Sequence, residues 1–191
     1  TVKRGDYRLV KEVPVSIYSE GAGDMPHDVK RVLVPGVEFQ LINDSANPVT
    51  SPETGDEVEP GGVVCTIVTD ENGLATTKDE NADANGWSKP EGWSAPLAYG
   101  TYSVHEVIPA DVTAKFKAEY GKTLLPVDDF KITISDEGQY DPPVLVSNKI
   151  PQTPLKVVKA DAETGKQIPL AASFELYDAD GNLVTYTLHY P

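Results

Sequence analysis

The chain has 191 residues, and its 30 acidic side chains against 16 basic ones give a formal net charge of −14. This balance argues against nucleic acid and anionic membranes as partners, and no run approaches the roughly 18 apolar residues of a membrane span. Cys65 is the only cysteine, so no disulfide can form within the chain. The 15 glycines and 16 prolines, without a long stretch of helical periodicity, predict an all-β fold with many turns.

Alternating apolar stretches between clusters of turn residues predict strands along the chain. They lie near residues 7–17, 37–43, 63–69, 100–108, 130–135 and 143–148. We expect a loop around residues 18–30, a longer loop over 76–97, and a short helix over 110–121. Cys65 falls in the third strand with no histidine or other ligand at useful spacing. We therefore interpret it as a core side chain and predict neither a metal site nor a cofactor.

Three polar residues stand where the strand pattern calls for apolar ones. Every second residue of a strand faces the same side, and the neighbours of Lys11, Glu106 and Asn148 at that spacing are aliphatic. Burying a lone ammonium or carboxylate costs several kcal/mol unless the charge is paired or neutralised. An amine, an acid and a carboxamide in one apolar core can form an amide bond between side chains. The simpler alternative is that Lys11 reaches solvent, Glu106 pairs with it, and Asn148 caps a turn.

The chain also repeats part of itself. The segment Arg8-Leu9-Val10-Lys11 reappears as Lys156-Val157-Val158-Lys159, and Phe39-Gln40-Leu41 reappears as Phe174-Glu175-Leu176. A short linker stiffened by proline, residues 148–154, separates the two copies. We therefore expect a complete module over residues 1–150 and the N-terminal part of a second, truncated module over residues 151–191.

Five elements, taken in chain order, carry a family resemblance. They are Leu9-Val10-Lys11, Pro35-Gly36-Val37-Glu38-Phe39-Gln40-Leu41, Thr69-Asp70-Glu71-Asn72-Gly73-Leu74, Tyr99-Gly100-Thr101-Tyr102-Ser103-Val104-His105-Glu106, and Val146-Ser147-Asn148-Lys149. Over nearly its whole length the chain resembles the Cna B-type (SpaA-like, prealbumin-like) repeat domains of Gram-positive surface adhesins and sortase-assembled pilins. The resemblance implies a Greek-key β-sandwich of the reverse immunoglobulin-like type. One departure follows Glu106, where Val107-Ile108-Pro109-Ala110 replaces the family's Thr-x-Ala-Pro-x-Gly-Tyr.

Carried over residue by residue, the resemblance implies an isopeptide bond between Lys11 and Asn148 that Glu106 promotes. An apolar surrounding favours a neutral, nucleophilic amine, and Glu106 can polarise the carboxamide as an acid and carry protons. Each molecule reacts once with itself, so this is not an enzyme activity. In the second copy Lys159 has the matching context, but its acid and amide partners are absent from this chain.

The resemblance further implies a structural role as a stalk module of a cell-wall-anchored adhesin or pilin, outside a Gram-positive cell. Its partners are then the neighbouring modules of the same surface protein. A second hypothesis is a ligand-binding module whose long loops contact a host or matrix ligand, with Trp87 and Trp93 as the contact residues. These tryptophans can equally pack the loop onto the sheet. A third hypothesis is an accessory domain of a secreted enzyme, although no catalytic motif supports it.

The tripeptide Arg4-Gly5-Asp6 matches the integrin-binding motif. Three residues match by chance often, and the segment before the first predicted strand resembles a polar linker. We therefore do not predict integrin binding from it.

Overall fold

The computed structural model describes residues 1–17, 28–148, 159–167, 175–177 and 179–183. The chain divides into two compact units, one made of Thr1–Val15 and Arg31–Ile150 and the other of Ser16–Lys30 and Pro151–Pro191. In the second unit the described residues include two isolated antiparallel bridges, Ala160 with Gln167 and Tyr177 with Leu183. Several predictions fall outside the described residues: most of the loop over 18–30, the linker after residue 148, and the repeat positions 156–158 and 174.

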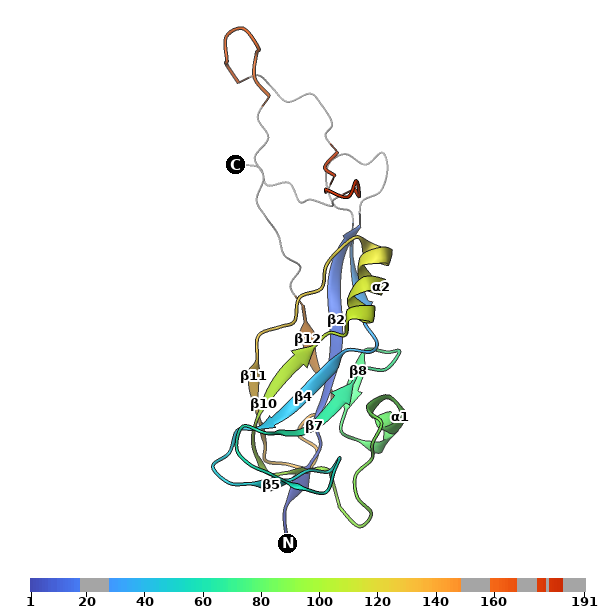
Figure 1. The fold of residues 1–191 in the computed structure, drawn as a ribbon, viewed down its shortest axis with the longest axis vertical. Coiled ribbons are helices and arrows are strands. Elements are labelled where there is room, and N and C mark those ends of the chain that lie inside the picture. The colour runs from blue at the N-terminus through green and yellow to red at the C-terminus, as the bar shows by residue number, and fades with distance from the viewer. Residues whose placement is uncertain (18–27, 149–158, 168–174, 178, 184–191) are drawn as a thin grey trace. The chain divides into compact units, whose positions relative to one another are not determined.

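Two four-stranded sheets make up the sandwich of the first unit (Figure 1). One sheet is antiparallel, in the order β11 (Phe130–Ile134), β10 (Gly100–Val107), β4 (Glu38–Asn43) and β7 (Val63–Val68). The other has the order β12 (Val144–Ser147), β2 (Arg8–Ile17) and β3 (Asp28–Leu33), with β8 (Leu74–Thr76) paired to β2. β12 runs parallel to β2 and places Val146 opposite Lys11. The first long strand and the last strand of the unit are therefore direct neighbours.

Shorter elements complete the first unit. They are the strand pairs β1 (Arg4–Gly5) with β9 (Leu97–Ala98) and β5 (Val49–Thr50) with β6 (Glu57–Val58), the 3-10 helix η1 (Asp79–Asn81), and the helices α1 (Ala82–Asn85) and α2 (Ala110–Tyr120). α2 begins just after Pro109 and ends at Gly121, whose left-handed backbone (φ 66°) is the usual helix stop. None of the helices in the described ranges is long and apolar enough to cross a membrane.

The core lies between the two sheets, because alternate residues of each strand point inward. Phe39 and Leu41 of β4 are fully buried, and Val104 of β10 is buried in the same way. Cys65 of β7 belongs to this core, and burial raises the pKa of its thiol. The predicted core role of this cysteine is confirmed.

The predicted all-β sandwich is also confirmed. Every predicted strand has a counterpart, and the predicted helix is α2. β3 differs from the prediction, since it begins at Asp28, inside the stretch expected to be a loop. Val32 and Val34 are both buried at strand spacing and are the signal that could have revealed it.

The expected long loop over residues 76–97 contains η1 and α1, held by two asparagine side chains. The amide of Asn81 donates to the Leu74 carbonyl at 2.7 Å. The amide of Asn85 donates to the Thr76 carbonyl at 2.8 Å, and its oxygen accepts from the Val68 N–H at 2.8 Å. These bonds fasten the loop to β7 and β8. Sequence periodicity cannot show such bonds, because each joins one side chain to a backbone group of another element.

Candidate functional site

Lys11 lies in the middle of the sandwich. It is on the inner face of β2, between Leu9 and Val13, and the three side chains have an exposure of 0%. Its backbone N–H donates to the Gly73 carbonyl at 2.7 Å. β2 has neighbouring strands on both sides, so the lysine stem has no short path to water. The alternative that Lys11 extends to solvent is therefore wrong.

Glu106 faces Lys11 from the opposite sheet. It lies on β10, opposite Phe39 of β4, and is 1% exposed. Its Oε2 accepts from Lys11 Nζ at 2.6 Å, which makes a buried ion pair across the core. In Figure 1 the sheet containing β10 and β4 overlies the sheet containing β2, and this contact joins the two layers.

Asn148 completes the site directly after β12. Its backbone N–H donates to the Glu12 carbonyl at 3.2 Å, which continues the pairing of β12 with β2. The side chain is 2% exposed, and its Nδ2 donates to Glu106 Oε1 at 2.9 Å and to the Leu125 carbonyl at 2.6 Å. Asn148 Oδ1 is buried and has no hydrogen-bond partner in the described part of the chain.

One carboxylate thus contacts both nitrogens. Glu106 Oε2 meets the amine of Lys11, and Oε1 meets the amide nitrogen of Asn148. Oε1 also accepts from the Val127 N–H at 3.3 Å. The carboxylate contacts the nitrogen of the Asn148 amide, whereas Oδ1 of the same amide has no hydrogen-bond partner among the described residues. Polarisation of the carboxamide by Glu106 stays a prediction. The arrangement suits transfer of a proton from one nitrogen to the other.

Burial sets the electrostatics of the site. It lowers the pKa of Lys11, and the hydrogen bond that Lys11 donates to Glu106 partly opposes this shift. The aromatic ring of Phe39 forms part of the surrounding, with its centroid 6.0 Å from Lys11 Nζ. A lowered pKa makes the neutral, nucleophilic amine more accessible than it is for a lysine in water.

The three residues singled out from the sequence therefore meet in one buried site. Sequence reasoning missed the two backbone groups that complete it, the Leu125 carbonyl and the Val127 N–H. Backbone groups are the same in every residue, so no residue type marks them. The departure after Glu106 leads into α2, and the chain that follows this helix supplies both groups.

The remaining predicted residues lie elsewhere. Lys159 is exposed in the second unit. Trp87 is buried, and its Nε1 donates to the Thr66 carbonyl at 2.7 Å, so it packs the long loop onto β7. Trp93 is half-buried, with the guanidinium carbon of Arg4 3.5 Å from its ring centroid. A ligand contact by these tryptophans stays a prediction.

Each residue of the Arg4-Gly5-Asp6 tripeptide has a structural partner. Arg4 stacks on Trp93, and Asp6 accepts from the Thr77 hydroxyl at 3.2 Å. Arg4 and Gly5 pair with β9 as strand β1. The tripeptide is thus part of a strand and its connection to β2, and the tertiary contacts account for all of its side chains.

Gly5 is expected to tolerate no side chain. A Cβ there would lie 2.8 Å from both the Asp136 carbonyl oxygen and Ile134 Cγ2. We expect Gly5→Ala to lower the free energy of unfolding by about 1 to 3 kcal/mol, the usual cost of overpacking. Urea denaturation measures this change. Gly138→Ala is the matched control, because nothing lies within 4 Å of a Cβ at that position; equal stability of the two variants would contradict the prediction.

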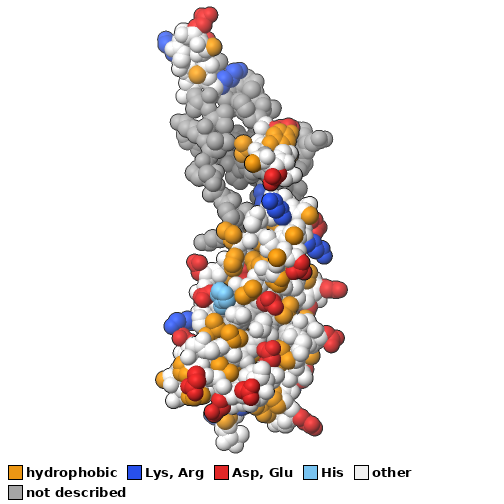
Figure 2. Space-filling view, in the orientation of Figure 1, with side chains coloured by type: hydrophobic (Ala, Val, Ile, Leu, Met, Phe, Trp, Pro, Cys, Tyr) orange, Lys and Arg blue, Asp and Glu red, His pale blue; other side chains and the backbone are white. Residues whose placement is uncertain are grey.

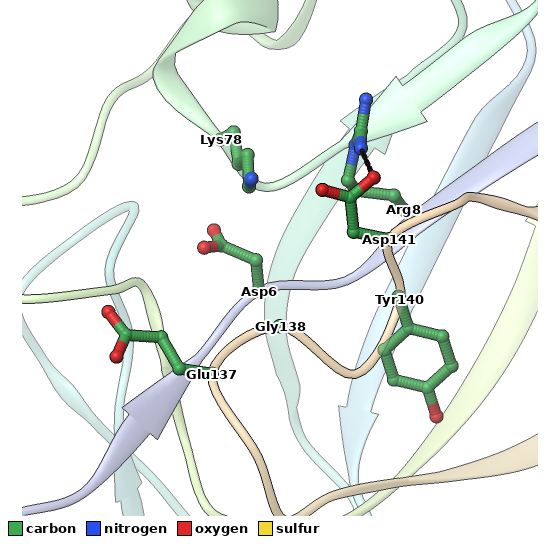
Figure 3. Close-up of a pocket in the computed structure, with 7 residues that line it drawn as sticks. All are labelled: Asp6, Arg8, Lys78, Glu137, Gly138, Tyr140 and Asp141. Atoms are coloured by element: carbon green, nitrogen blue, oxygen red, sulfur yellow. Dashed lines mark hydrogen bonds and ion pairs between the residues drawn. The ribbon is translucent and has the colours of Figure 1, made fainter.

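A small hollow near the N-terminus does not make a second site (Figure 3). Its lining is mostly charged: Asp6, Arg8, Lys78, Glu137, Gly138, Tyr140 and Asp141. Arg8 bonds Asp141 at 3.0 Å and Glu80 at 3.3 Å, and Lys78 faces Asp6 across the hollow. Arg8 and Lys78 thus each have an acidic neighbour, and within the described ranges no three acidic, histidine or cysteine side chains are placed to hold a metal ion.

Comparison with known proteins finds remote structural similarity to pilins. No family model matches the chain, and no curated protein sequence matches it. Among solved structures, the shaft pilin SpaA from Lactobacillus rhamnosus GG is similar at 20% identity and a TM-score of 0.37, over 95% of this chain and 63% of that chain. A double mutant of the same pilin gives 20% identity and a TM-score of 0.37, over 99% and 68% of the two chains. The chain thus spans 63% of the length of the first pilin structure. Likeness this remote carries no argument about the site, which rests on the residues described above.

Proposed function

We propose that this chain is a structural stalk module of a cell-surface adhesin or pilin, held together by an isopeptide bond between Lys11 and Asn148. The observation that carries the proposal is the contact of Lys11, Glu106 and Asn148, each at most 2% exposed. A buried ion pair is weak evidence for stability, because desolvation offsets much of the attraction. Formation of the amide removes the lysine charge from the core. The reaction that the geometry favours therefore also removes the desolvation cost of that charge.

The chemistry uses only groups of this chain. Glu106 Oε2 takes a proton from Lys11 Nζ, 2.6 Å away, and leaves a neutral amine. The amine attacks Cγ of Asn148, and the bond from Cγ to Nδ2 breaks. A proton passes from Glu106 Oε1 to the departing nitrogen, 2.9 Å away, so that ammonia leaves. The attacking nitrogen then gives its second proton to Glu106, and a neutral amide remains beside a protonated acid. Folding holds the reacting groups together and supplies the effective concentration that a separate enzyme would otherwise provide.

The proposed bond has a mechanical consequence. β2 carries the chain in from the N-terminal side, and the chain leaves the sandwich at Asn148 after β12. Tension applied to the two ends would shear these parallel neighbours apart. A bond from Lys11 to Asn148 would carry the tension directly, so that the residues between positions 11 and 148 would not bear it. This is the property that a stalk module needs.

The proposal places the chain outside a Gram-positive cell, among neighbouring modules of the same surface protein. The sequence resemblance to Cna B-type repeats supports this setting. The acidic surface agrees with a solvated stalk, since Figure 2 shows acidic side chains scattered over the visible face of the described residues. Host or matrix ligands remain a hypothesis for the long loops.

Intact mass under denaturing conditions tests the bond. We expect the chain to be lighter than its sequence by about 17 Da, the mass of the ammonia released. Peptide mapping should recover linked peptides that contain Lys11 and Asn148, and Lys11→Ala should remove the deficit. A chain with the full mass of its sequence would contradict the proposed bond.

One side reaction needs a control. Asn72 is exposed and precedes Gly73, and an Asn-Gly pair can lose ammonia by forming a succinimide of the same mass deficit. Mild alkali hydrolyses a succinimide and returns the mass of water, whereas an isopeptide bond persists. Asn72→Ala should leave the deficit unchanged. A deficit that disappears in Asn72→Ala would assign the loss of ammonia to the turn instead of the core.

A further inference from the structure

The segment between α2 and β11 passes over the side of the site where Asn148 lies. We call residues 124–127 the strap. Leu124 is 3% exposed and anchors the strap in the core, whereas the side chain of Leu125 is 49% exposed. The Leu125 backbone carbonyl nevertheless contacts the buried site. Figure 1 shows the chain leaving α2 and running along the sandwich toward β11, in the neighbourhood of β12.

The strap offers one acceptor and one donor, and each meets a partner. The Leu125 carbonyl accepts from Asn148 Nδ2 at 2.6 Å, and the Val127 N–H donates to Glu106 Oε1 at 3.3 Å. Pro126 lies between them. It has no N–H of its own, and it restricts Leu125 to extended backbone conformations. The strap therefore presents two polar backbone groups in a fixed order. The Leu125 carbonyl faces the amide of Asn148, and the Val127 N–H faces the carboxylate of Glu106.

These contacts fix which way the amide of Asn148 points. With Nδ2 toward Leu125 and Glu106, both N–H groups have acceptors. The reversed amide would place Oδ1 against the Leu125 carbonyl oxygen with no proton between them. The strap thus turns the leaving nitrogen toward the acid that is to protonate it. The cost is that Oδ1 stays buried without a hydrogen-bond partner among the described residues.

We propose that the strap is the positioning element of the cross-linking site, and that the Leu125 carbonyl makes the site selective for a carboxamide over a carboxyl side chain at position 148. This rests on the proposed cross-link. In Asn148→Asp the side chain has no N–H. An ionised aspartate would face the Leu125 carbonyl oxygen with a second oxygen, and a protonated one has a single proton for two acceptors. Reaction of the aspartate releases water where reaction of the asparagine releases ammonia.

Kinetics of linking test the selectivity. The full chain is recovered unfolded, refolded by dilution, and sampled by intact mass, with Asn148 or Asn148→Asp. We expect the aspartate chain to link at least about tenfold more slowly, the rate effect of roughly one hydrogen bond. Pro126→Gly loosens the exposed strap without opening the core. It should slow cross-linking of the asparagine chain and bring the linking rates of the asparagine and aspartate chains to within about twofold of each other. Pro60→Gly, an exposed proline outside the site, should change neither rate.

Two results would overturn the inference. One is equal rates for asparagine and aspartate with the native strap. The other is a ratio of rates that Pro126→Gly leaves unchanged, because a strap with only a structural role would slow both chains by the same factor. Recovery of the native ratio in Pro126→Ala, which keeps a more restricted backbone than glycine, would support the positioning role.

A second measurement separates the strap from the cross-link itself. Lys11→Met has no nucleophile, so Asn148 keeps its side-chain amide whatever the native chain does. Hydrogen exchange of that NH₂ group, followed by NMR, should be about tenfold slower with the native strap than with Pro126→Gly added. If the native chain never loses ammonia, the cross-link fails and this measurement alone decides the strap. Equal exchange in the two variants would overturn the positioning role.

Discussion

Glu106→Ala is expected to abolish the mass deficit and to lower the midpoint of thermal unfolding more than any other single change in the core. Two effects add. The cross-link would close a loop of more than a hundred residues, and its loss removes about 4 to 5 kcal/mol of stabilisation by the measure used for disulfides. Lys11 also loses its partner while buried. Breaking a buried pair costs about 3 to 5 kcal/mol, less whatever deprotonation of the lysine relieves.

The loss of the cross-link alone, near 5 kcal/mol, would lower the unfolding temperature of a unit of this size by about 10 to 20 °C. Calorimetry and intact mass on the same preparation measure both parts of the prediction. Glu12→Ala is the matched control. Glu12 neighbours Lys11 on β2, is 5% exposed, and pairs with Arg31, whose side chain is 65% exposed. This variant should lose about 1 kcal/mol or less and keep the full mass deficit.

The outcome that contradicts the role of Glu106 is a mass deficit retained in Glu106→Ala. If Glu106→Ala lacks the deficit but unfolds at the same temperature as Glu12→Ala, which keeps it, then the bond forms in the native chain but contributes little to stability. The backbone carbonyl of Glu12, which accepts from the Asn148 N–H, is unchanged in the control. Any difference between the variants therefore comes from the side chains.

The second large effect is mechanical. Single chains pulled from both ends should differ in extension according to whether Lys11 can react. In Lys11→Met the sandwich unfolds completely, and the residues between positions 11 and 148 add on the order of 480 Å at up to about 3.5 Å per residue. In the native chain the cross-link should hold these residues out of the load path, so that this extension is missing. Residues after position 148 lie outside the cross-linked loop, so their extension is the same in both chains and serves as an internal reference.

Extension is a better readout here than unfolding force. Lys11→Met leaves Glu106 buried without the ammonium, so the variant unfolds at lower force for reasons unrelated to a covalent bond. The released length depends only on which residues are free to extend. A native chain that releases the same length as Lys11→Met would contradict the proposed cross-link, even if the two differ in stability.

The strands and the inward faces of the reactive residues could be predicted from local sequence pattern. Alternation with a period of two is local, so the aliphatic neighbours of Lys11, Glu106 and Asn148 were enough to place each side chain inside. The structure buries all three. The same reasoning identified Cys65 as a core residue and found α2, because periodicity and turn residues are written in consecutive positions.

The contacts between segments distant in sequence follow only from the tertiary structure. It paired β12 with β2 in parallel, set Glu106 against the amide nitrogen of Asn148, and brought the strap over the site. Strand order and backbone contacts arise from packing between segments far apart in the chain, such as Lys11 and Val146. The polar groups of the strap belong to the backbone, which is chemically the same at every residue. No local pattern in the sequence could mark them, and only the folded chain shows that they complete the site.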